Sequence, residues 1–78
     1  MKEQSQQYNT TYHTPLTAKE MERGKTIHVV IYTDMGEQTL KVTIPPGSKD
    51  GQKLRIKNKG RQGPDGRGDL YLNLVQQE

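Results

Sequence analysis

Residues 42–60, with the sequence VTIPPGSKDGQKLRIKNKG, combine two strand patterns with three turn signals. Residues 42–44 alternate apolar and polar side chains, which is typical of a half-buried strand. The Pro-Pro pair that follows removes two ladder donors and ends this strand, and Pro46 with Gly47 fits the centre of a type II turn. After an Asp-Gly turn, apolar and basic residues alternate over residues 53–57. The stretch therefore predicts two strands that share one apolar face.

The rest of the chain repeats this alternation on either side of the stretch. Residues 8–14 predict a weak, polar first strand that Pro15 bounds or places at a sheet edge, and residues 25–32 predict the most apolar strand. A connection over residues 33–38 leads back into a partner strand, and residues 69–75 predict the last strand, after a polar glycine-rich loop. We predict a core of Leu16, Met21, Leu40, Val42, Ile44, Leu54, Ile56, Leu70, Leu72 and Leu74.

One short helix interrupts these strands. The sequence TAKE from Thr17 to Glu20 is a capping box, in which the threonine hydroxyl accepts from the glutamate N–H and the carboxylate reaches back. Gly24 follows where a helix of about two turns would end, as expected for residues 18–23. Five strands with one short helix predict an all-β fold, a small antiparallel β-sandwich or partly open barrel.

Composition limits the chain to one small domain of 78 residues, which we expect to fold from residue 8 to 78 behind a disordered tail at residues 1–7. The absence of cysteine excludes disulfides and thiolate metal sites and suits a cytoplasmic protein. No apolar run is long enough for a membrane span or a signal-peptide core. His13 and His28 lie in separate predicted strands with no partner at catalytic or metal-ligand spacing. We therefore expect neither an enzyme site nor a cofactor.

Charge is concentrated in one segment. Residues 49–67 carry seven basic side chains against two acidic ones, whereas the first 48 residues carry five of each sign. One interpretation is a solvated strand face on which lysine discourages edge aggregation. The alternative is a face that binds nucleic acid by electrostatics. The candidate residues for that face are Lys53, Arg55, Lys57, Lys59 and Arg61.

The pattern IPPGxxDGxxLRxxxKG over residues 44–60, the GDLYL strand that begins at Gly68 and the segment LTAKEMERG before residue 25 resemble one known domain. They are similar to the first C-terminal domain of DnaJ-type co-chaperones. Members with a zinc module carry it between the two strands that only TDMGE joins here, so the resemblance is to the zinc-free class. The sequence contains no His-Pro-Asp tripeptide of a J domain, and we expect no second C-terminal domain or dimerising helix within these 78 residues, which would form either one domain of a longer co-chaperone or a stand-alone relative. The resemblance implies that a DnaK-type chaperone would be a partner only through a J domain that this chain lacks.

The resemblance also implies a function. In the family, unfolded client polypeptide adds as an extra strand in a shallow apolar groove beside the strand that follows the short helix, which is β-augmentation. Carried over to this sequence, the groove strand is residues 25–29, and the first strand forms the second wall. That first strand carries asparagine and threonine where the family has aliphatic residues. The candidate peptide-binding residues are Lys25, Ile27, Val29, Tyr8 and Tyr12, and binding of DNA to the basic face is the alternative.

Overall fold

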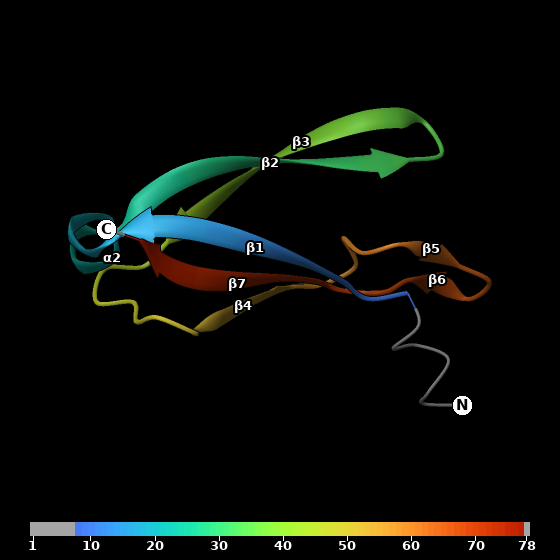
Figure 1. Cartoon of the computed structure of the whole chain (residues 1–78). Helices are drawn as coiled ribbons and strands as arrows, with labels where there is room; N and C mark the ends of the chain where they lie inside the picture. Colours follow the sequence, from blue (N-terminus) through green and yellow to red (C-terminus); the bar gives the residue numbers. More distant parts are fainter. Residues whose placement is uncertain (1–7, 78) are drawn as a thin grey trace.

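The computed structural model describes residues 8–77, so the tail predicted to be disordered, residues 1–7, lies outside the described residues. Seven strands and one helix follow one another along the chain (Figure 1). They are β1 (Thr10–Thr17), α2 (Ala18–Arg23), β2 (Lys25–Thr33), β3 (Gly36–Ile44), β4 (Lys53–Ile56), β5 (Gln62–Gly63), β6 (Gly66–Arg67) and β7 (Leu70–Gln77).

The strands form three sheets. In the three-stranded sheet β7 lies in the centre, with β1 parallel on one side and β4 antiparallel on the other. The hairpins β2–β3 and β5–β6 are both antiparallel, and Figure 1 shows the long β2–β3 hairpin lying across the three-stranded sheet from the end that carries α2. The predicted all-β class with one short helix is confirmed, and over residues 8–77 the sheets do not close into a barrel.

The first strand runs further than its sequence predicts. Pro15 was expected either to bound the strand near residue 14 or to place it at a sheet edge, and the structure has the second arrangement: β1 is an edge strand that continues through the proline to Thr17. The N–H of Thr10 donates to the carbonyl of Asp69 on the β7 side. Along a strand, the backbone N–H groups of successive residues point alternately to the two edges, so the even-numbered residues of β1 face β7 and the odd-numbered residues face away from it. Pro15 therefore directs its nitrogen, which carries no hydrogen, away from β7 toward an unpaired edge, where no donor is needed.

The helix has the capping box that its sequence predicts. The N–H of Glu20 donates to the Thr17 hydroxyl at 3.1 Å, and the Thr17 N–H donates to the Glu20 carboxylate at 2.9 Å. At the other end, the backbone N–H groups of Gly47 and Ser48 donate to the Met21 carbonyl at 3.0 and 3.1 Å. The turn that opens the connection from β3 to β4 thus satisfies a carbonyl that the end of the helix leaves free.

Both predicted turns of this connection are present, and both contain a glycine at positive φ. Gly47 has φ of 82° and Gly51 has φ of 83°, values at which only glycine is free of strain. The N–H of Gly51 donates to the Leu74 carbonyl at 2.8 Å, which attaches the second turn to β7. The two turns therefore dock on the helix and on the central strand.

Two connections differ from the prediction. The hairpin β2–β3 turns over only two residues, so β3 begins at Gly36 inside the predicted connection. The predicted polar loop contains the small hairpin β5–β6, whose ends are joined by the Gly68 N–H, which donates to the Arg61 carbonyl at 2.9 Å, and the backbone of Tyr8 lies against these ends. The Arg61 N–H donates to the Tyr8 carbonyl at 2.7 Å, and a Cβ atom on Gly68 would overlap that carbonyl. The glycines of this segment thus allow a close approach of backbones.

The core agrees with the prediction in six of its ten residues, which are Leu16, Met21, Ile44, Leu70, Leu72 and Leu74. The other four are only partly buried and pack against this core: Leu40, Val42, Leu54 and Ile56. Val29 and Ile31 are buried as well and were missing from the predicted core. On the opposite face of β2, Val30 and Tyr32 are 41% and 71% exposed, so the sheet does not curl to bury both faces.

Candidate functional site

One edge of β2 has no strand beside it within residues 8–77. Because two residues join β2 to β3, the closing pair Thr33 and Gly36 exchanges both backbone hydrogen bonds. Such pairs alternate along an antiparallel ladder, so the odd-numbered residues of β2 direct their backbone groups at β3. The even-numbered residues direct theirs at what we call the open edge, and these residues are Thr26, His28, Val30 and Tyr32.

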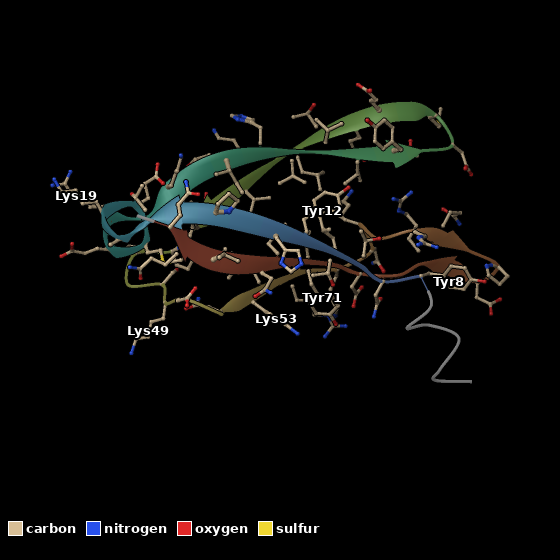
Figure 2. The ribbon with its side chains drawn as sticks, viewed as in Figure 1. Tyr8, Tyr12, Lys19, Lys49, Lys53 and Tyr71 are labelled. Carbon is tan, nitrogen blue, oxygen red and sulfur yellow. The ribbon has the colours of Figure 1, made fainter. Side chains whose placement is uncertain are left out.

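Tyr12 of β1 reaches this open edge. Its hydroxyl donates a hydrogen bond of 3.3 Å to the carbonyl oxygen of Val30. That carbonyl is one of the groups that the register places at the open edge, so the contact supports the assignment independently. In Figure 2, Tyr12 lies between the ribbon of β1 and the hairpin β2–β3. A strand added beside β2 would compete with the Tyr12 hydroxyl for this acceptor.

The other candidate residues of β2 differ in how they are buried. Val29 is 8% exposed and belongs to the core, and Ile27 is half-buried against it. Both side chains therefore form part of the inner layer. Lys25 is exposed at the start of the strand, where its ammonium lies 2.6 Å from the Glu20 carboxylate. This hydrogen bond is the main reason that the pKa of Glu20 lies below its usual value, and the Thr17 N–H adds to it.

Tyr8 lies away from β2. Its ring packs on Gly63 of the small hairpin, and its carbonyl accepts from the Arg61 N–H. Figure 2 shows Tyr8 beside β5 and β6, whereas Tyr12 points to the β2–β3 hairpin. The structure thus brings Tyr12, but not Tyr8, to the open edge of β2.

A shallow hollow of about 180 Å³ lies at the ends of β1 and β2 that are distant from α2. We call it the basic hollow, because every charged side chain that lines it is a cation. Thr10, Ile31 and Gly60 form part of its wall. The side chains with functional groups that line it are Tyr12, Tyr32, Lys59, Arg61 and Arg67.

The five basic residues proposed from sequence do not form one face. Lys53 and Arg55 are exposed on the outer face of the three-stranded sheet, where Arg55 is the cross-strand neighbour of Tyr71. Figure 2 shows Lys53 and Tyr71 on this side. Lys59 and Arg61 line the basic hollow instead, and Lys57 lies in the turn between the two.

Asp69 links the start of β7 to Arg55 of β4 and to the turn that follows β4. Its carboxylate is 15% exposed, accepts the Asn58 N–H at 3.0 Å and lies 2.7 Å from the Arg55 guanidinium. The pKa of Asp69 lies below its usual value, chiefly because of the Asn58 N–H and further because of Arg55. The charge of Arg55 is therefore engaged within the domain, which leaves Lys53 as the unpaired cation of this pair among the described residues.

Sequence reasoning missed Tyr32 and Arg67 as site residues. The chain places them 35 positions apart, and they meet only because β2 and the β5–β6 hairpin converge on β1. Tyr32 offered one signal, an aromatic residue on the second face of an apolar strand. Arg67 offered none beyond its charge, because it stands in a segment that reads as a polar loop.

Comparison with known proteins shows which family the chain belongs to. A family model described as the DnaJ C terminal domain matches residues 10–78. The chain belongs to this family. The resemblance that the PPG, LRI and GDLYL segments indicated is confirmed.

Relatives match about half of the chain. A DnaJ-like protein of Synechocystis is 50% identical over 42 residues, which cover 53% of this chain and 13% of that protein. Chaperone protein DnaJ 2 of Thermus thermophilus is 53% identical over 38 residues, covering 49% of this chain and 14% of the relative. The Curved DNA-binding protein of Escherichia coli is 49% identical over 38 residues, covering 49% and 12%. The matched part of the chain therefore spans only 12 to 14% of the length of these relatives.

Family membership and the DnaJ relatives support a chaperone-related role. The family is a chaperone domain and not a known enzyme family. Within the described part of the chain, no helix has the length and apolar character needed to cross a bilayer.

Proposed function

We propose that this domain binds unfolded or extended client polypeptide, which adds as a strand along the open edge of β2, starting at Lys25–Val29. The observation that carries the proposal is the row of backbone groups of Thr26, His28, Val30 and Tyr32, beside which no strand lies within residues 8–77. An unpaired strand edge is a template for a further strand, and main-chain hydrogen bonds make such binding tolerant of client sequence.

Apolar client residues would find partners on both sides of the added strand. Half of its side chains would face inward, toward Tyr12 and the half-buried Ile27. The other half would lie beside the exposed Val30 and Tyr32. Alternate side chains of a strand point to opposite faces, so an apolar-rich segment suits this position better than a charged one.

Affinity is expected to be about micromolar or weaker. A few main-chain bonds must offset the ordering of a flexible client and the loss of the Tyr12 contact to Val30. Lys25 is held by Glu20 at the start of the strand, where its charge discourages pairing between two copies of this edge.

An NMR titration with a short, unstructured, apolar-rich peptide tests the proposal. We expect changes in the backbone amide shifts of residues 26–32 and Tyr12. The ring resonances of Tyr12 should be among those that change most. The variant Ile27→Ser should weaken binding, and Thr43→Ser on the opposite edge of the same hairpin is its control. Shifts centred on residues 53–57, or none at millimolar peptide, would contradict the proposal.

Binding of DNA is the second candidate function. It rests on the name of one relative, the Curved DNA-binding protein, and on the cations that form no ion pair among residues 8–77. The structure distributes the proposed residues over two places, Lys53 and Arg55 on the outer sheet face and Lys59 and Arg61 at the basic hollow. Phosphate contacts release counterions, so binding to labelled duplex DNA should fall steeply with salt. Absence of binding at low salt, or binding that salt leaves unchanged, removes this candidate.

A further inference from the structure

The basic hollow combines three cations with no compensating acid in its lining. Lys59, Arg61 and Arg67 are the charged residues that line it. The ion pairs of the described residues join Lys25 to Glu20 and Arg55 to Asp69, so none involves a cation of the hollow. Like charges held close together without a counter-ion favour an incoming anion.

Arg67 is held at the wall of the hollow by a backbone contact. Its Nη2 donates to the Gly60 carbonyl, which holds the guanidinium at the wall of the hollow. Its Nε is buried and has no hydrogen-bond partner. The guanidinium therefore places a fixed positive charge at the wall of the hollow, while its buried Nε is not accessible to a ligand there.

The hollow also continues the open edge of β2. Tyr32 is the last of the even-numbered residues whose backbone faces that edge, and its side chain lines the hollow. Tyr12, whose hydroxyl marks the edge at Val30, lines the hollow as well. A strand paired with residues 26–32 would therefore lead directly into the hollow at one of its ends.

We infer that the basic hollow is a subsite for the carboxylate of an acidic side chain that directly flanks the apolar part of the client segment. This inference rests on the proposed function. A volume of about 180 Å³ suits a single side chain, whereas single-stranded nucleic acid engages about four or more nucleotides along a continuous basic track. The client would thus be apolar where it pairs with β2 and acidic at the end that reaches the cations.

Three peptides with one common apolar segment test the subsite. The first carries glutamate before the segment, the second carries it after the segment, and the third carries glutamine at both places. An added strand that is antiparallel to β2 brings its N-terminal end to the hollow, and a parallel one brings its C-terminal end. We expect one glutamate peptide to bind about 3- to 10-fold tighter than the glutamine peptide at low salt, with the preference decreasing as salt rises.

The double variant Lys59→Gln/Arg61→Gln should remove this preference and leave the affinity for the glutamine peptide unchanged. The matched control is Lys53→Gln, which removes a cation from the outer sheet face and should retain the preference. If all three peptides bind equally well, the subsite is wrong while strand addition stands. If none binds, strand addition fails and the subsite fails with it. If single-stranded DNA binds instead and Lys59→Gln/Arg61→Gln abolishes that binding, the hollow takes nucleic acid and the carboxylate subsite is wrong.

Discussion

The two larger sheets of this domain differ in how completely their strands are paired and buried. In the three-stranded sheet, β7 has a partner on both sides, and its inward residues Leu70, Leu72 and Leu74 are fully buried. The hairpin β2–β3 leaves both outer edges unpaired over residues 8–77, and Leu40 and Val42 are only partly buried. We expect the three-stranded sheet to supply most of the stability, and the hairpin is the surface that we propose for binding.

The largest expected effect is a loss of stability when the buried face of the three-stranded sheet is truncated. Replacing Leu72 with alanine leaves a cavity around the central strand and should lower the free energy of unfolding by about 2 to 4 kcal/mol. Leu40→Ala, which makes the same change in the half-buried hairpin, should cost clearly less. Chemical denaturation of both variants measures the difference. Equal losses, or no loss for Leu72→Ala, would show that stability is not concentrated in the three-stranded sheet.

A smaller effect is expected where the chain passes from β4 to β7. Alanine at Gly68 would place its Cβ against the Tyr8 carbonyl, and separating these backbones should cost about 1 to 3 kcal/mol. The control is Gln62→Ala, an exposed side chain in the same small hairpin. Thermal melts compare the two variants. If Gly68→Ala were as stable as the control, the close passage of Tyr8 would not constrain this segment.

The smallest of these effects depends on pH. The pKa of Asp69 is lowered by the Asn58 N–H and by Arg55, so its contribution to stability is present above its ordinary pKa of 3.8 and is lost as pH falls through the lower folded value. Asp69→Asn should therefore reduce stability at neutral pH and flatten its decline in acid. Denaturation midpoints of both proteins, measured from pH 7 down to about pH 2, check this difference in acid stability. Glu22→Gln, on the exposed side of α2, is the control, and an unchanged acid profile for Asp69→Asn would contradict the account.

Features that depend on neighbouring residues were predictable from sequence. The capping box of Thr17 and Glu20 and the glycine turns at Gly47 and Gly51 need only local chemistry, and each occurs as expected. The alternation of apolar residues likewise identified the inward face of β7. These elements carry the family resemblance, so the fold class followed from them.

Features that depend on distant parts of the chain were not predictable. The passage of β1 through Pro15 depends on which edge its nitrogen faces, and that is set by parallel pairing with the far end of the chain. The backbone of Tyr8, which lies more than fifty positions earlier, packs against the ends of the β5–β6 hairpin. The basic hollow is assembled from three separate segments, so no local pattern announces it. The candidate edge was expected at residues 25–29, whereas the register extends the row of open backbone groups to Tyr32.

The most direct test of the central claim compares two prolines in the β2–β3 hairpin. His28→Pro removes a backbone N–H from the open edge of β2, and Thr39→Pro removes one from the outer edge of β3. Neither change touches a β2–β3 hydrogen bond, because both residues belong to pairs of the ladder that exchange no backbone hydrogen bond with each other. The measurement is the affinity of each variant for an apolar-rich peptide. Denaturation midpoints are measured as well, to show that the two variants are equally stable. The account predicts that His28→Pro loses most of the binding while Thr39→Pro retains it. Equal affinity in the two variants, or loss only in Thr39→Pro, would contradict strand addition along β2.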